Sequence, residues 1–190
     1  MEFIEGISPN LPEHLRSDLF KYRYNVFVEQ LGWELDTPHG REIDQFDHDE
    51  TLYVIARNDR KDVIGCARLL PTTSPYLLEE VFPELLNGLP IPKSSDVWEL
   101  SRFTSMDIAN GPLVKNAQFS TEVTLDLLKH SIRCAQQYGA KRIISVSPIG
   151  IERLLRKAGI KAHRAGPPKI IDGYPLIACW IECDQDVLTA

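Results

Sequence analysis

Near the middle of the chain stands Asp96-Val97-Trp98-Glu99-Leu100-Ser101-Arg102-Phe103, which combines strand-forming apolar residues with charged ones. The run predicts a strand over residues 97–104, in which charges need partners because they are rarely buried alone. Glu99 and Arg102 are three positions apart, so a regular strand points them to opposite faces. Both can line one site only if the strand bulges or bends there, and we expect that departure.

Outward from this strand, hydrophobic periodicity and turn residues predict the other elements. The first half of the chain is predicted to form an amphipathic helix over 12–30 that Ser8 or Asn10 caps, a polar loop over Gly32–Asp49, and strands at Thr51–Arg57 and Val63–Leu70. A helix over Tyr76–Leu86, which Pro83 breaks, follows these strands. The second half is predicted to form a helix from Ser120 to Gly139, a strand at Ile143–Val146, a short helix that Ser147-Pro148 opens, and closing strands at Ile170–Ile171 and Leu176–Ile181. This order predicts an α/β fold with three α/β/α layers and a mixed, bulged central sheet.

The composition fits one globular domain. The 190 residues, 43% of them hydrophobic, suit a single domain over residues 1–190. A net charge of −6 argues against nucleic-acid binding, and no stretch approaches the roughly 20 apolar residues that span a bilayer. The acidic N-terminus is unlike a signal peptide, and the four cysteines form no Cys-x-x-Cys pair. We therefore expect reduced thiols in a cytoplasmic protein.

Arg23, Phe27 and Trp33 form the first candidate binding group. Arg23 and Phe27 are four residues apart on the predicted helix and share a face, and Trp33 follows the stop at Gly32. A guanidinium beside two aromatic rings can grip a carboxylate and stack on a cation or a purine. The alternative is a helix end with a surface arginine and two core aromatics.

The second candidate is the acidic loop Arg41-Glu42-Ile43-Asp44-Gln45-Phe46-Asp47-His48-Asp49-Glu50. Such a loop is usually only solvated. Phe46 would anchor it inward and fix Asp44 and Asp47, whose carboxylates could then bind an amine or a sulfonium. A metal is a further option, although the spacing does not match a calcium loop.

Arg68 joins Glu99 and Arg102 as the third candidate group, because it lies in the neighbouring predicted hairpin. The three residues could form a structural ion network, or Glu99 could be a base that the two cations position. No serine or cysteine has a nearby histidine, and no P-loop, Gly-x-Gly-x-x-Gly or His-Glu-x-x-His run occurs. Any chemistry is therefore a direct transfer between two bound substrates.

Together and in order, these residues resemble the LuxI-type acyl-homoserine-lactone synthases. The words Phe-Val-Glu-Gln-Leu-Gly-Trp, Asp-Gln-Phe-Asp, Ala-Arg-Leu-Leu and Glu-Leu-Ser-Arg-Phe carry the resemblance, which is looser after residue 105. It implies a GNAT-like N-acyltransferase fold, no metal and no cofactor. The implied substrates are S-adenosylmethionine and an acyl thioester on acyl carrier protein or coenzyme A. The products are an N-acyl-homoserine lactone and methylthioadenosine.

The resemblance also implies roles for single residues. Glu99 would accept the amine proton, with Asp44, Asp47, Arg68 and Arg102 as the other catalytic residues. The residues expected to bind S-adenosylmethionine are Arg23, Phe27, Trp33, Asp44 and Phe82. The residues expected to line the acyl pocket are Leu100, Ser101, Phe103, Ile144 and Val146. Family members that prefer 3-oxo chains tend to have a threonine near Ile144, so isoleucine favours an unsubstituted chain, unless a one-residue shift places Ser145 there.

A basic segment completes the expectations. Residues 141–169 contain eight Lys and Arg against the single acid Glu152. Arg142, Arg153, Arg156 and Lys157 could dock an acidic acyl carrier protein, or they could be an ordinary solvated surface. Two other functions stay open at this point: a GNAT-like N-acyltransferase that uses acyl-coenzyme A for another acceptor, and a non-enzymatic binding module, which would not need Glu99.

Overall fold

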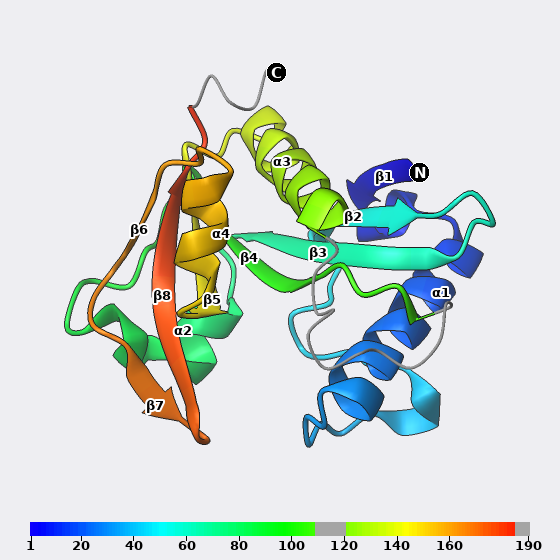
Figure 1. Cartoon of the computed structure of the whole chain (residues 1–190), viewed down its shortest axis with the longest axis horizontal. Coiled ribbons are helices and arrows are strands. Elements are labelled where there is room, and N and C mark those ends of the chain that lie inside the picture. Colours follow the sequence, from blue (N-terminus) through cyan, green and yellow to red (C-terminus); the bar gives the residue numbers. More distant parts are fainter. Residues whose placement is uncertain (109–120, 185–190) are drawn as a thin grey trace. The chain divides into compact units, whose positions relative to one another are not determined.

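The structure, a computed structural model, describes residues 1–108 and 121–184 and divides into two compact units. Among the described residues, unit 1 comprises residues 1–68, 102–108 and 121–131, and unit 2 comprises residues 69–101 and 132–184. Strands β3 (Val63–Pro71) and β4 (Val97–Thr104) contribute residues to both units (Figure 1). No helix in the described ranges is both long and apolar enough to cross a membrane.

Unit 1 contains β1 (Glu2–Ile7), α1 (Glu13–Arg23), β2 (Leu52–Arg57) and the first part of β3. The order of its strands is β1-β2-β3, and β1 pairs with β2 in antiparallel fashion. Strand β1 was missed by the sequence analysis, because its few apolar residues are too short a signal. The apolar face of α1 packs on the sheet in a core of buried residues that includes Leu15, Leu19, Tyr22, Tyr53 and Ile55.

The first predicted helix, over 12–30, has two parts with different geometry. The α-helix ends at Arg23, and Tyr24–Gln30 continue as a π-helix, in which the Leu31 N–H reaches the Val26 carbonyl five residues back. The predicted caps were wrong: Ser8–Asn10 form a short 3₁₀ helix, and Pro12 takes the N-cap position without a side-chain hydrogen bond. The wider turns direct the chain from the end of the helix toward Trp33. The Trp33 N–H donates to the Phe27 carbonyl at 2.9 Å.

Unit 2 is built on a mixed sheet with the strand order β4-β5-β8-β6 and with β7 also paired to β8. Strands β4 and β5 are parallel, and the pairs of β8 with its neighbours are antiparallel (Figure 1). The remaining strands of this unit are β5 (Arg142–Pro148), β6 (Ala162–Arg164), β7 (Lys169–Ile171) and β8 (Tyr174–Glu182). Strand β6 was not predicted, since three residues carry no periodic signal.

The helices of unit 2 are α2 (Leu77–Val81), the C-terminal part of α3 (Thr121–Gln137) and α4 (Ile151–Lys157). The 3₁₀ turn at Pro83–Leu86 interrupts the second predicted helix as expected. The last predicted helix begins later than proposed, because Ser147 and Pro148 still pair with β8 at the end of β5. The predicted start of the long helix at Ser120 lies outside the described residues.

Strand alternation gives the sheet of unit 2 two faces. Glu99, Ile144 and Trp180 lie side by side in register on one face, here called the Glu99 face. Helix α2 lies against this face, because the backbone N–H groups of Leu77 and Leu78 bond to the Glu99 carboxylate.

The opposite face, here called the Ser145 face, carries Leu100, Ser145 and Cys179. Helix α4 lies against it, because Arg164, the register neighbour of Cys179, bonds Glu152 of α4. Within unit 2, helices therefore cover both faces of a mixed sheet, as predicted for the fold class.

The backbone of β4 departs from regular strand geometry at Arg102, which has a φ of 50° in the left-handed region. A non-glycine residue there costs on the order of 1–3 kcal/mol, so the conformation persists only because its surroundings hold it. The expected departure from alternation is therefore present. Glu99 belongs to unit 2 and Arg102 to unit 1. That both side chains line one site therefore stays a prediction.

Candidate functional site

Arg23, the last residue of α1, stands at the centre of a buried ionic network in unit 1. Its NH1 and NH2 groups donate to the two carboxylate oxygens of Asp47 at 2.7 and 2.8 Å, and its Nε donates to Glu42 at 2.5 Å. Arg23 is fully buried. The fork geometry of the guanidinium matches the planar carboxylate, which gives a bidentate pair. Arg23 is thus a core cation rather than the surface arginine of the alternative interpretation.

Two further arginines complete this network. Arg68 NH1 donates to Asp44 at 2.5 Å and lies 3.2 Å from Asp47. Arg102 NH2 donates to Asp44 at 2.7 Å and to Glu42 at 3.0 Å. Three guanidinium groups therefore face three carboxylates, and the formal charges cancel. This cancellation is what allows so many charged groups to leave water.

The protonation of the network follows from burial and charge. Burial raises the pKa of Glu42, but the opposing effect of Arg23 and Arg102 is larger, and the pKa lies below its ordinary value. The pKa of Asp47 is also pushed up by burial and is held well below its ordinary range by Arg23 and Arg68. Both carboxylates are consequently ionised at neutral pH.

The acidic loop is ordered by its own backbone as well as by the arginines. Phe46 is buried, and Arg68 lies over its ring at 5.6 Å, so the predicted inward anchor is confirmed. The Phe46 N–H donates to Asp44 and the Asp44 N–H donates to Asp47, each at 2.9 Å. These contacts leave Asp47 buried, with a side chain 1% exposed, whereas that of Asp44 is 16% exposed. Asp44 is therefore the carboxylate of the pair that reaches the rim.

The aromatic pair lies beside this rim. Phe27 and Trp33 are stacked with ring centroids 4.7 Å apart, and the Arg102 guanidinium is 5.6 Å from each centroid. Phe27 is buried in the core, but Trp33 is 40% exposed. A surface pocket of about 360 Å³ adjoins the acids and is lined by Leu35, Asp36, Glu42, Ile43, Asp44 and Gln45. An anionic rim with an exposed indole suits a ligand that is both cationic and aromatic.

Glu99 occupies a separate place, in unit 2. Its side chain is fully buried, and its two oxygens accept the N–H groups of Leu77 at 3.1 Å and of Leu78 at 2.7 Å, at the start of α2. Both bonds fix the orientation of the carboxylate. Ile144 is its register neighbour on β5 and is also fully buried. Phe82 lies at the end of α2 in this unit.

The alternation of β4 and β5 sorts the predicted acyl-pocket residues. Ser101, Ile144 and Val146 lie on the Glu99 face, whereas Leu100 lies on the Ser145 face. The Ser145 hydroxyl is 3.0 Å from that of Ser147, on the face away from Glu99. Ile144, rather than Ser145, is thus the residue beside Glu99. Phe103 belongs to unit 1.

The four basic residues predicted to dock a carrier protein also divide into two groups. Arg153, Arg156 and Lys157 are exposed on α4, three and four residues apart, so they share one helix face. Glu152, the acid of this segment, is engaged by Arg164. Arg142 is not part of this helix face: its guanidinium lies 4.3 Å from the Trp180 centroid, on the Glu99 face.

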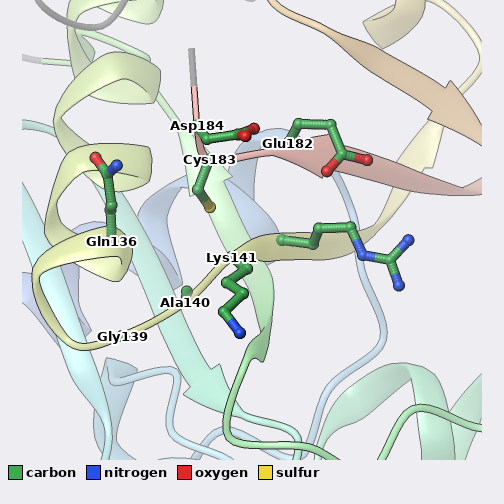
Figure 2. A pocket seen from close by; sticks show the side chains of 8 residues that line it. Gln136, Gly139, Ala140, Lys141, Glu182, Cys183 and Asp184 are labelled. Carbon is green, nitrogen blue, oxygen red and sulfur yellow. The ribbon is translucent and has the colours of Figure 1, made fainter.

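Arg142 also lines a second pocket, of about 570 Å³, where β5 begins and β8 ends. Figure 2 shows Gln136 of α3 on one side of it, Lys141 at the entry to β5, and Glu182, Cys183 and Asp184 at the end of β8. Lys141 bonds Asp96 at 2.6 Å at the surface. Cations and acids are mixed in this lining, so it shows no preference for one sign of charge.

The structure brings together seven of the predicted residues, which all lie in unit 1: Arg23, Phe27, Trp33, Asp44, Asp47, Arg68 and Arg102. Two residues of the network were not predicted from the sequence: Glu42, and Tyr53, whose hydroxyl donates to Asp47 at 2.7 Å. Glu42 was counted only as one acid of a solvated loop, and Tyr53 only as a strand residue. Excess arginine was a usable signal for Glu42, because three buried cations require three anions. Nothing local distinguished Tyr53.

The family model described as autoinducer synthase matches residues 10–190. An acyl-homoserine-lactone synthase of Acinetobacter nosocomialis is 53% identical over 182 residues, which are 96% of this chain and 100% of the relative. Another, of Ralstonia solanacearum, is 44% identical over 190 residues, which are 99% of this chain and 91% of the relative.

Solved structures show the same likeness. TofI, in a ternary complex with an inhibitor and MTA, is 42% identical with a TM-score of 0.86, over 100% of this chain and 95% of TofI. BjaI, a CoA-dependent acyl-homoserine lactone synthase with SAM and isopentyl-CoA, is 26% identical with a TM-score of 0.82, over 98% of this chain and 84% of BjaI. The predicted fold class is thereby confirmed.

The charge balance of the network predicts a large effect of Glu42→Gln. The change leaves Arg23 and Arg102 buried without the charge that both contact, which costs about 3–5 kcal/mol in the free energy of unfolding. Chemical denaturation followed by tryptophan fluorescence measures it. Asp49→Asn, in the exposed part of the same loop, is the control and should change stability by no more than about 0.5 kcal/mol. Equal stabilities of the two variants would contradict the network.

The lowered pKa values of Asp47 and Glu42 predict a pH dependence with a definite sign. Because both folded-state values lie below those of the unfolded chain, their stabilisation is complete above about pH 5 and is lost as the pH falls below about 4. Denaturation curves at pH 7 and at pH 3.5 measure the loss. Glu42→Gln should lose less than the unchanged protein between these two pH values, and an equal loss would argue against the assignment.

Proposed function

The chain belongs to the autoinducer synthase family, and we propose how its residues divide the synthesis of an N-acyl-L-homoserine lactone. The reaction transfers an acyl group from a thioester to the amine of S-adenosylmethionine, closes the lactone and releases methylthioadenosine. The observation that carries the residue assignment is the neutral network of three arginines and three carboxylates, which offers Asp44 at its rim beside Trp33. Residues 1–190 act as one synthase domain in this proposal.

S-adenosylmethionine binds at this rim. Its sulfonium and ammonium groups are cations, and its adenine is aromatic, so the exposed Trp33 and the partly exposed Asp44 are suitable partners. Phe27 stacks on the indole ring of Trp33. Asp47 is assigned a different role from the one that the sequence suggested: five donors surround its buried carboxylate, so it holds Arg23 and the loop instead of the ligand. These donors are the N–H of Asp44, NH1 and NH2 of Arg23, NH1 of Arg68 and the Tyr53 hydroxyl.

The two chemical steps make different demands. The amine must lose a proton before it attacks the thioester, and we assign this proton to Glu99, directly or through a water. Two backbone N–H groups orient its carboxylate. In the second step the methionyl carboxylate attacks its own γ-carbon and expels the thioether. That step needs a folded substrate, and the pocket beside Asp44 supplies the confinement.

The acyl chain lies on the Glu99 face of unit 2 in this proposal. Ser101, Ile144 and Val146 are its lining, and Leu100 is excluded because it lies on the opposite face. Ile144 cannot donate a hydrogen bond, which favours a chain without an oxygen at the 3-position. In the same proposal Phe82 binds S-adenosylmethionine and Phe103 lines the acyl pocket.

The proposed acyl donor is acyl carrier protein. Three exposed cations on one face of α4, whose acid is already engaged by Arg164, suit the acidic surface of such a carrier. The alternative donor is an acyl-coenzyme A, because the similar protein BjaI is CoA-dependent. Synthesis takes place in the cytoplasm in this proposal, because Cys66, Cys134, Cys179 and Cys183 are all free thiols. Burial raises the pKa of Cys66 to about 12, which keeps this thiol unreactive.

Expression in a bacterium that makes no such signal tests the reaction and the role of Glu99 together. Mass spectrometry of the culture extract should find a homoserine-lactone fragment for the unchanged protein, and Glu99→Gln should lower its amount by about a hundredfold or more. Asp49→Asn is the control for expression and folding. A Glu99→Gln protein that is as active as the control would remove Glu99 from the role of base.

Charge reversal on α4 tests the donor. Arg153→Glu, Arg156→Glu and Lys157→Glu together should raise the KM for acyl carrier protein about tenfold or more and leave the KM for S-adenosylmethionine unchanged. Lys21→Glu with Arg60→Glu, a reversal of two exposed cations in unit 1, is the control for charge reversal away from α4. An unchanged KM for the carrier, together with efficient use of acyl-coenzyme A, would favour the alternative donor.

A further inference from the structure

Tyr53 on β2 is a buried group that the proposed chemistry does not use. It is 1% exposed, and its hydroxyl donates to Asp47 Oδ1 at 2.7 Å. The ring packs edge-on against Phe20, with ring centroids 6.2 Å apart. Burial and the neighbouring Asp47 charge both raise the pKa of Tyr53, so its proton stays in place. The hydroxyl is therefore a permanent donor to a carboxylate of the network.

The oxygen that Tyr53 contacts is shared with two arginines. Asp47 Oδ1 also lies 2.7 Å from Arg23 NH1 and 3.2 Å from Arg68 NH1. The other oxygen, Oδ2, accepts the N–H of Asp44 at 2.9 Å. A partial rotation of the carboxylate would lengthen these hydrogen bonds. Tyr53 adds a donor on a strand to the side that carries Oδ1, and its hydrogen bond therefore opposes such a rotation.

We propose that Tyr53 is a positioning residue for S-adenosylmethionine: through Asp47 it holds the backbone of Asp44, and thereby aims the Asp44 carboxylate at the ligand. This inference rests on the proposed function of the Asp44 rim. The path is short and continuous, from the Tyr53 hydroxyl to Asp47 and from Asp47 to the Asp44 N–H. Tyr53 itself does not touch the ligand.

Tyr53→Phe tests this role with the removal of one oxygen atom. Calorimetric titration with S-adenosylmethionine should show affinity about tenfold weaker than that of the unchanged protein, because the Asp44 carboxylate samples other orientations. In steady-state assays the KM for S-adenosylmethionine should rise and the KM for the acyl donor should stay the same.

Tyr22→Phe is the matched control. Tyr22 is also buried in unit 1, and its hydroxyl exchanges hydrogen bonds with the Met106 carbonyl at 2.9 Å and N–H at 3.0 Å, without contact to the carboxylates. Its loss should lower thermal stability to a similar extent and leave the affinity for S-adenosylmethionine unchanged. Equal weakening of binding in the two variants would mean that Tyr53 has only a structural role, and would overturn the inference.

A double-mutant cycle with Asp44→Asn tests the path. If Tyr53 acts through Asp44, the double variant binds S-adenosylmethionine no more weakly than Asp44→Asn alone. Additive losses would overturn the proposal. If the unchanged protein does not bind S-adenosylmethionine, the proposed function fails and this inference fails with it. If the unchanged protein binds it and Tyr53→Phe binds equally well, the inference alone fails.

Discussion

Three guanidinium groups and three carboxylates share the interior of unit 1, and neither set could be buried without the other. Removing one member leaves an uncompensated charge in a region of low dielectric, which is far more costly than losing a surface ion pair. The network therefore ties the end of α1, the acidic loop, β3 and β4 to one another through Arg23, Glu42, Arg68 and Arg102. In our proposal the function of the network follows from this rigidity, because a carboxylate that binds a sulfonium and an amine in a defined geometry needs a rigid support.

Rigidity is also the reason why we assign different roles to two neighbouring aspartates. Asp47 is saturated by donors and closed to solvent, and Asp44 keeps contact with the surface. In unit 2 a similar principle acts with backbone donors, since the N–H groups at the start of α2 fix the Glu99 carboxylate. In both places a hydrogen-bonded frame orients an acid before any substrate arrives, which is the form of preorganisation that transfer chemistry requires.

Much of the fold could be predicted from the sequence, because the long periodic segments and the Pro and Gly stops reflect local physics. The irregular backbone at Arg102 was accessible through a simple argument: Glu99 and Arg102 are both charged, and regular alternation would separate them. The π-helix after Arg23, strands β1 and β6 and the role of Tyr53 were not accessible. Excess arginine indicated only that an anion was needed, and that Glu42 supplies it depends on a contact with Arg102, 60 positions further along the chain.

The most direct test of the account is a crystal structure of the protein with S-adenosylmethionine or methylthioadenosine. The account predicts that the adenosyl group lies against Trp33 and that, with S-adenosylmethionine, the amine lies within hydrogen-bond distance of Asp44, while the arginine network keeps its contacts. A ligand bound elsewhere, for example in the pocket beside Lys141 and Arg142 (Figure 2), would contradict it. So would a complex in which the ligand displaces Asp47 from Arg23.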